Sequence, residues 1–264
     1  MQLPRPPASE DPATTLSHAL HQFWIRCLWA RIYASLYAPP ALARSRSDQS
    51  IQEENISAFH KELKEWICSI PPEPLRPRTG LPLCTFGSAE DYKITYNETI
   101  LLLFRGELIK GKQGDEQSFL ECMRASSEIC DSCKTLYVGK PINYTWSTLH
   151  VIFLAGLTYM HCLWVSPKCR DTTRLDKVSE TLTKCTMLLT IMAERWHSVG
   201  SYRDLFEPLA SKTMALVVKS SQNTDFASDR SPIDTNDVTQ RISKMSSEGA
   251  PDVFEALLTK MFEE

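Results

Sequence analysis

Glycine is scarce in this chain, with nine residues in 264, and none of them form the patterns that cradle phosphates or dinucleotides. The sequence also has no Gly-x-Ser-x-Gly and no His-Glu-x-x-His, and its six histidines show no metal-ligand spacing. These absences exclude the nucleotide-binding, serine-hydrolase and zinc-protease classes that such motifs identify. Few glycines beside long apolar periodic runs favour a helical fold over a turn-rich β fold.

An excess of positive charge is also missing. The formal net charge is −3 and the isoelectric point is near 6.1, which gives no electrostatic case for nucleic-acid binding by this chain. The N-terminal stretch MQLPRPPASEDPATT lacks the apolar core of a signal peptide. The nine cysteines are therefore interpreted as reduced thiols of a nuclear or cytosolic protein.

Residues 145–167 contain no charged side chain, which raises the question of a membrane span. A spanning helix needs about 20 mostly apolar residues. Here the apolar run is interrupted by five more polar side chains, His150, Thr158, Tyr159, His161 and Cys162. We expect the central buried helix of a soluble domain, with a membrane span as the alternative, and no contact with a membrane.

Apolar residues recur at steps of three and four through most of the chain, which predicts helices. The expected helices cover 15–37, 50–70, 91–110, 116–137, 144–165, 171–196 and a segment from about 201. The first carries Leu16, Leu20, Phe23, Cys27, Ala30 and Ala34 at this spacing. Ser88, three residues before Asp91, is the expected cap of the 91–110 helix, and Gly111 is its expected stop.

The predicted fold class is all-α, a multi-helix orthogonal or bundle domain with a disordered N-terminus and C-terminal tail. The expected divisions are a disordered segment 1–14, a helical domain 15–220, a disordered linker 221–249 and an acidic amphipathic helix 250–264. The last segment either docks into a partner's groove or packs back on the bundle through Val253, Phe254, Leu257, Leu258 and Phe262. The strict apolar seam from Leu175 to Trp196 fits either a coiled-coil dimer or an internal bundle face.

A family resemblance lies in the 91–110 helix. The residues Tyr-Asn-Glu-Thr-Ile-Leu-Leu-Leu-Phe-Arg-Gly, 96–106, resemble the Tyr-x-x-x-x-Leu-Leu-aromatic-Arg-Pro signature of the fungal-specific transcription factor domain, with Gly106 in place of proline. This domain is the middle homology region of binuclear zinc-cluster regulators. An earlier segment with Trp66 and a later one with Glu194-Arg195-Trp196 resemble further parts of the family pattern. The matched signature residues, expected to be structural, are Tyr96, Leu102, Leu103, Phe104, Arg105, Trp66 and Trp196.

The resemblance implies a nuclear transcription regulator, with the cytoplasm as the alternative location, that acts without a cofactor or chemistry of its own. Its implied partners are proteins, through the transcription machinery or self-association, and a small-molecule effector. A metabolic or biosynthetic pathway, including secondary metabolism, is the implied target. His150 and His161 share one helix face and are candidates for an effector pocket; ordinary core histidines are the alternative.

The zinc cluster of this family needs six cysteines with two Cys-x-x-Cys pairs in a short basic segment. Only Cys130 and Cys133 have this spacing, and they lie in the middle of an expected helix, as core thiols. DNA contact is therefore expected only through a module absent from this sequence, which looks like the C-terminal part of a regulator or an incomplete gene model. The enzyme alternative is an all-helical terpene-cyclase-like protein, but the sequence has no Asp-Asp-x-x-Asp, and Asn236-Asp237 lacks the rest of the second metal motif.

Overall fold

The computed structural model describes residues 15–38, 49–71, 88–111, 114–137, 145–222 and 252–263. Within these ranges all regular structure is helical and no strand occurs, which confirms the all-α fold class. The predicted disordered segment 1–14 lies outside the described residues, as does nearly all of the predicted linker 221–249.

The chain divides into two compact units, Met1–Leu103 and Phe104–Glu264. The boundary falls within a single helix, α4 (Ala89–Ile109), so each unit contains part of that helix. Each unit is described by itself, and a single domain over 15–220 stays a prediction.

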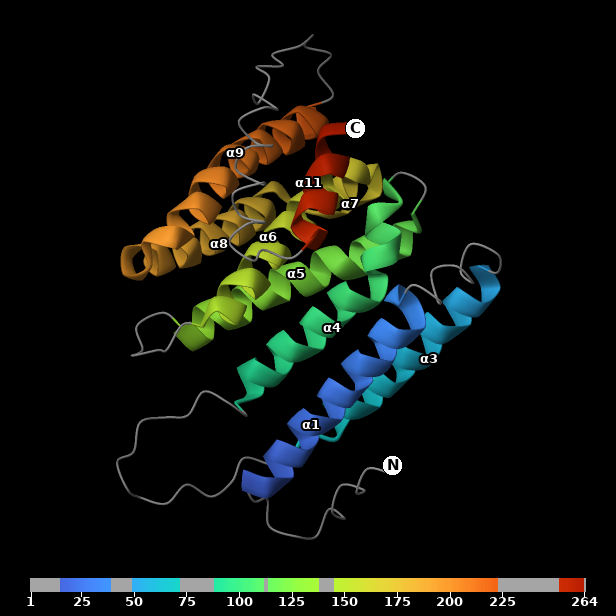
Figure 1. Cartoon of the computed structure of the whole chain (residues 1–264). Coiled ribbons are helices and arrows are strands. Elements are labelled where there is room, and N and C mark those ends of the chain that lie inside the picture. The colour runs from blue at the N-terminus through green and yellow to red at the C-terminus, as the bar shows by residue number, and fades with distance from the viewer. Residues whose placement is uncertain are drawn as a thin grey trace. The chain divides into compact units, whose positions relative to one another are not determined.

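The first unit contains α1 (Thr15–Ile32), a π-helical turn η1 (Tyr33–Tyr37), α3 (Gln49–Cys68) and most of α4 (Figure 1). Helices α1 and α4 run parallel, because a residue early in α1 contacts one early in α4 and a later residue contacts a later one. His18 contacts Tyr92, and Trp29 contacts Thr99. Trp66 of α3 contacts His21, while Glu62 binds Arg31, so α3 runs antiparallel to α1. The core of the unit forms where the three helices meet.

The buried face of α1 differs from the stripe singled out in the sequence. Ile25, Leu28 and Ile32 are fully buried, whereas Phe23 keeps 55% of its surface exposed. Ala30 and Ala34 of the same stripe are exposed too. Both faces of this helix are apolar, so spacing alone predicted the helix correctly without indicating which face meets α3 and α4.

The two ends of α4 form as the sequence predicts. The hydroxyl of Ser88 accepts a hydrogen bond from the backbone N–H of Asp91 at 3.2 Å, satisfying a free donor in the first turn. Gly111, two residues after the helix, has φ of 61°, in the left-handed region where a side chain would be strained.

The second unit is organised around α6 (Trp146–Val165), which packs against α5 (Glu116–Tyr137), α8 (Leu175–Arg195), α9 (Gly200–Gln222) and α11 (Asp252–Glu263). The short helices α7 (Pro167–Thr172) and η3 (His197–Val199) connect these elements. Of the described helices, α6 is the one long and apolar enough to cross a membrane, yet most of its residues are buried among its neighbours. Its apolar character is thus accounted for by its position in the core.

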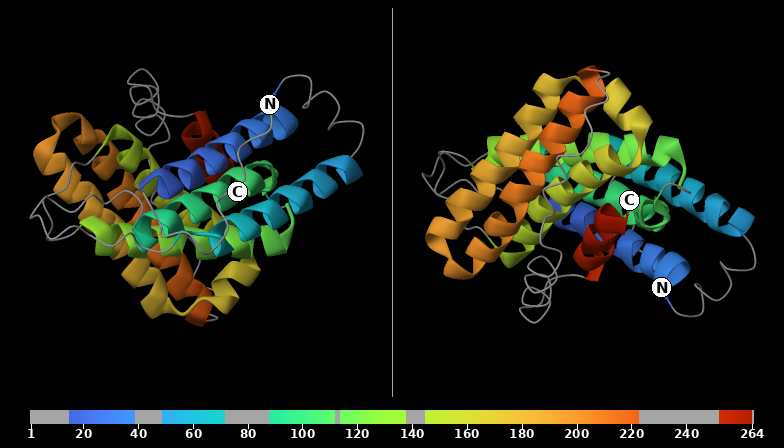
Figure 2. Two further views of the ribbon diagram at one scale, coloured as in Figure 1. Left: turned by 90° about the horizontal axis from the view of Figure 1, so that it is seen from below. Right: turned by 90° about the horizontal axis from the view of Figure 1, so that it is seen from above.

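The apolar seam of α8 faces inward. Val178, Leu182, Cys185, Leu189 and Met192 are all buried within the unit, while Leu175 at the start keeps 40% of its surface exposed. Of the two predicted alternatives for these residues, a coiled-coil dimer face and a face inside the bundle, the structure shows the second. Helix α9 lies beside α8 (Figure 2) and continues through Pro208, whose side chain is exposed.

The acidic C-terminal helix packs back on the bundle. The apolar side chains of α11 that contact α6 and its neighbours are buried: Val253, Phe254, Leu257, Leu258 and Met261. The ring of Phe254 meets Phe153 edge to face at a centroid distance of 5.0 Å. Of the two sequence-based alternatives for this helix, packing on the bundle is the one found here.

Candidate functional site

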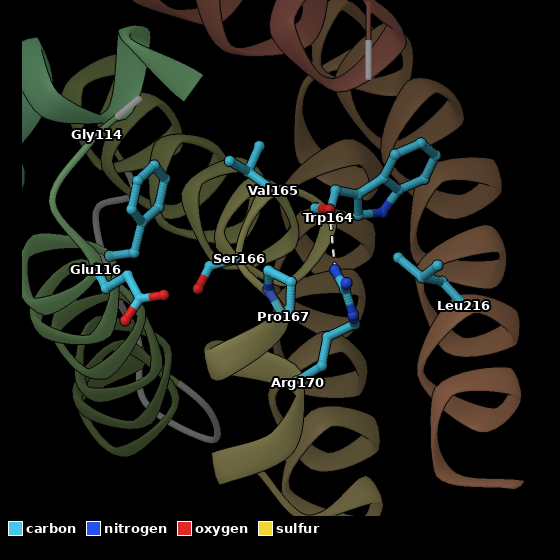
Figure 3. Close-up of a pocket in the computed structure, with 9 residues that line it drawn as sticks. Gly114, Glu116, Trp164, Val165, Ser166, Pro167, Arg170 and Leu216 are labelled. Carbon is cyan, nitrogen blue, oxygen red and sulfur yellow. Dashed lines mark hydrogen bonds between the residues drawn. The ribbon is translucent and has the colours of Figure 1, made fainter. Parts of the chain in front are cut away.

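A pocket of about 340 Å³ lies in the second unit where α6 ends. It opens between the first turn of α5, the α6–α7 junction and the end of α9 (Figure 3). Its lining is mostly apolar, with a guanidinium, a carboxylate and a hydroxyl among it: Gly114, Glu116, Phe119, Trp164, Val165, Ser166, Pro167, Arg170 and Leu216. This volume is at the lower end of the range for small-molecule sites, about 300–1,000 Å³.

The local sequence explains why a hollow forms here. Pro167 cannot continue α6, and Ser166 before it takes an extended conformation with φ of −102° and ψ of 113°. The Ser166 hydroxyl then accepts a hydrogen bond from the N–H of Cys169 at 3.3 Å and caps α7. The chain therefore turns sharply at Ser166, and α7 projects Arg170 back toward the end of α6.

Arg170 binds the free carbonyls at the end of α6. Its Nη1 donates to the backbone oxygens of Leu163 at 2.6 Å and Trp164 at 3.0 Å (Figure 3 marks the second). A cation suits this position because the helix dipole places partial negative charge at the C-terminus. Among the described residues, no carboxylate forms an ion pair with Arg170, so its charge is balanced only by these carbonyls.

Trp164 forms a fixed wall of the pocket. Its indole N–H donates to the Thr213 hydroxyl of α9 at 2.8 Å, and that hydroxyl donates to the carbonyl of Leu209 at 2.8 Å. The chain of hydrogen bonds holds the indole plane between α6 and α9. Gly114 forms part of the opposite wall, where a Cβ would lie 2.6 Å from the carbonyl oxygen of Glu107.

Two opposite charges lie at the mouth. Glu116 forms an ion pair with Lys168, with 3.1 Å between Oε2 and Nζ, and more than half of the Glu116 side chain is exposed. The opposite charges of Glu116 and Lys168 neutralise each other, so Arg170 sets the net charge of the pocket.

A second hollow of about 360 Å³ lies between α8 and α9. Its lining contains no charged side chain: Ser179, Leu182, Thr183, Thr186, Met187, Ala210, Ser211 and Met214. Without a charged or aromatic group, it offers little to orient a ligand.

The two histidines proposed for an effector pocket occupy different surroundings. Half-buried His150 lies 3.3 Å from the Tyr202 hydroxyl and contacts Phe254, and burial lowers its pKa. His161 is fully buried, and its Nε2 lies 2.9 Å from the carbonyl oxygen of Leu108. Neither lines the pocket at the end of α6, although His161 meets Phe119, one of its lining residues, at a centroid distance of 6.0 Å.

The signature residues divide between the two units. In the first, Trp66 and Leu103 are buried, Tyr96 is half-buried, and the carbonyl of Leu102 accepts a hydrogen bond from Tyr37 at 2.5 Å. In the second, the half-buried signature residues are Phe104, Arg105 and Trp196. Trp196 follows α8 directly, and its N–H donates to the carbonyl of Met192 at 3.0 Å. None of the seven lines the pocket at the end of α6.

The cysteines are mostly core residues of the second unit. Cys130 and Cys133 of α5 are buried, and burial together with the Cys130 thiol raises the pKa of Cys185 well above its usual value. Burial also raises the pKa of Cys122 and Cys162. Thiols that stay protonated are poor nucleophiles and poor metal ligands. Within the described ranges, no group of three histidine, cysteine or acidic side chains is placed to hold a metal ion.

Comparison with known proteins finds distant fungal relatives that are named as regulators, one of them as a transcriptional regulator. A transcriptional regulatory protein of Saccharomyces cerevisiae, YLR278C, is 23% identical over 49% of this chain and 11% of its own length. The positive regulator of purine utilization of Emericella nidulans is 23% identical over 40% of this chain and 10% of its own. The pyrimidine pathway regulatory protein 1 of S. cerevisiae is 26% identical over 87% of this chain and 24% of its own. No family model and no solved structure matches.

These relatives share one type of activity, because each is named as a regulator. The chain spans between about a tenth and a quarter of their lengths. The similarity therefore supports a transcription regulator and gives no support to an enzyme.

The pocket residues were not singled out in the sequence. Arg170 is the second basic residue after the uncharged stretch 145–167, and it follows a Ser-Pro break by three positions. A basic side chain near a helix C-terminus can bind the last free carbonyls of that helix. This tendency could have located Arg170, but not the partners that α5 and α9 bring to it.

Proposed function

We propose that this chain is the regulatory part of a fungal transcription regulator of the zinc-cluster type, which acts through protein and effector contacts in the nucleus. The observation that carries the proposal is the alignment with three proteins named as regulators, one of which covers 87% of the chain. DNA contact is assigned to a zinc-cluster module, which the cysteines of this sequence cannot form.

The character of the described residues supports a role in contact rather than catalysis. The described cysteines of the second unit are buried, and the pocket at the end of α6 is mostly apolar with Arg170 among its lining residues. Two relatives are named for purine utilization and a pyrimidine pathway. We therefore assign this chain to the control of a metabolic pathway, with the pathway's own small molecules as the class from which an effector would come.

The test is a tethering assay. The chain is fused to a heterologous DNA-binding domain, and transcription of a reporter carrying that domain's site is measured. We expect the fusion to change reporter output relative to the DNA-binding domain alone. A fusion with Leu157→Asp, which places a charge in the fully buried part of α6, should lose the effect.

The matched control is Lys177→Ala on the exposed surface of α8, which should behave like the unchanged fusion. Transcript profiles after deletion of the gene provide the second measurement. Unchanged reporter output, together with unchanged transcripts, would contradict the proposal.

A further inference from the structure

The pocket at the end of α6 presents a positive charge that the described residues do not pair with a carboxylate. Side chains of arginine that are withdrawn from water are normally paired with an acid or an anion. Arg170 is half-buried, and only its Nη1 is used by the carbonyls of Leu163 and Trp164. The capping role therefore accounts for one nitrogen and for part of the charge, since a helix C-terminus carries about half an elementary charge.

The rest of the guanidinium has the geometry to bind a carboxylate. A guanidinium has five N–H donors in a planar fork, and the fork matches the two oxygens of a carboxylate. In Figure 3 the Arg170 head group lies among the lining residues Trp164, Pro167 and Leu216. A carboxylate bound there would have apolar walls on one side, and charge-assisted hydrogen bonds are stronger where water is partly excluded.

The walls indicate what the carboxylate should be attached to. The indole of Trp164 offers a flat face fixed by Thr213, and Leu216 and Pro167 provide apolar surface beside it. Flat aromatic groups stack favourably on such a face. The volume of about 340 Å³ suits a ring system of one or two rings and excludes a folded peptide segment.

We propose that the pocket between α5, α6, α7 and α9 binds a small planar monocarboxylate, with the carboxylate on Arg170 and the ring against Trp164. Because Glu116 is neutralised by Lys168, Arg170 is the one cation among the described lining residues left to balance the ligand, so a monoanion is favoured over a dianion. Describing this ligand as an effector rests on the proposed function; the binding itself does not.

The probe is benzoate, with benzamide as its neutral match, at constant ionic strength. Binding is followed by the indole N–H signal of Trp164 in nitrogen-edited NMR spectra of the whole chain, assigned by its disappearance in Trp164→Phe. We expect benzoate to shift this signal in a saturable way with a millimolar Kd, and benzamide to bind at least about fivefold more weakly. The other indole signals should move less, because those side chains do not line the pocket.

Three variants separate the contributions. Arg170→Gln keeps a donor for the α6 carbonyls but removes the charge, and should raise the benzoate Kd at least about tenfold. Glu116→Gln leaves the Lys168 ammonium at the mouth without its carboxylate partner and should lower the Kd. Leu216→Trp fills the pocket while leaving the arginine at position 170 unchanged and should abolish the shift, which keeps the test decisive if Arg170→Gln does not fold.

The proposal is overturned if benzoate and benzamide bind equally, if folded Arg170→Gln binds benzoate as the unchanged chain does, or if no saturable shift occurs up to about 20 mM. Binding with the expected pattern supports it whatever the tethering assay shows. Reporter output that responds to the fused chain while benzoate fails to bind would refute the pocket and leave the regulatory role standing.

Discussion

The indole N–H of Trp66 donates a hydrogen bond to the backbone carbonyl of His21 at 3.0 Å, while the imidazole of His21 stacks on that indole at 4.8 Å. The two residues thus join α3 to α1 through a polar and an aromatic contact at once. Both are buried, and Tyr92 of α4 meets each ring edge to face. This cluster is the point at which all three helices of the first unit meet.

Trp66→Phe should reduce the free energy of unfolding by about 2–3 kcal/mol, because it removes the hydrogen bond to His21 and leaves a cavity. Urea denaturation of the purified chain measures the change. The matched control is Trp24→Phe, since half-buried Trp24 donates to Glu62 at 3.3 Å near the surface. It should cost less than about 1 kcal/mol, and equal losses in the two variants would refute the importance of the cluster.

His21 should make the protein less stable in acid. Burial, and secondarily the neighbouring His18, lowers the pKa of His21 from its usual 6.5 to about 4. The unfolded chain therefore binds the proton more readily between pH 6.5 and 4, and stability is lost as the pH falls through that window. The loss should reach about 2–3 kcal/mol and should be absent in His21→Phe, as measured by urea denaturation at several pH values. His197→Gln, an exposed site, should keep the dependence of the unchanged chain.

Glu98 should act in the opposite direction. Burial raises the pKa of Glu98 to about 7, against the opposing effect of Arg26, so the folded protein binds a proton more readily than the unfolded chain between pH 4.5 and 7. Stability from this group is present below pH 4.5 and lost as the pH rises to 7. Glu98→Gln should be more stable than the unchanged chain by about 1–2 kcal/mol at pH 8, after allowance for its partial exposure. The difference should vanish near pH 4, and exposed Glu65→Gln should show no such pattern.

The sequence predicted the helices well because their ends carry local signals. Ser88 and Gly111 set the limits of α4 through a cap and a left-handed turn, and α5 begins and ends at the predicted residues, 116 and 137. The pocket could not be predicted in the same way. Trp164, Arg170 and Leu216 come from three helices, and only tertiary packing brings them together.

The face of α1 shows the same limit in a single helix. The apolar residues around Phe23 and those around Leu28 both have helical spacing. No local feature of the sequence indicates which of the two sets is buried, and the structure buries the set with Leu28. Phe23→Ser should therefore change the free energy of unfolding by less than about 0.5 kcal/mol, as at other exposed sites. Leu28→Ala should cost about 2–5 kcal/mol, because Leu28 has no exposed surface. The reverse order in urea denaturation would show that the stripe with Phe23 is covered in solution.

Gly156 of α6 should not tolerate a side chain. A Cβ there would lie 2.4 Å from Phe206 and 2.6 Å from the Cys185 sulfur, so α6 could not keep its distance from α8 and α9. Overpacking of this kind usually costs about 1–3 kcal/mol, which exceeds the gain in helix propensity of up to about 1 kcal/mol from glycine to alanine. Gly156→Ala should lower the thermal midpoint, whereas Gly200→Ala, whose Cβ would meet nothing within 4 Å, should leave it unchanged or raise it. If Gly156→Ala melts at or above the temperature of the unchanged chain, α6 has room that this packing does not allow.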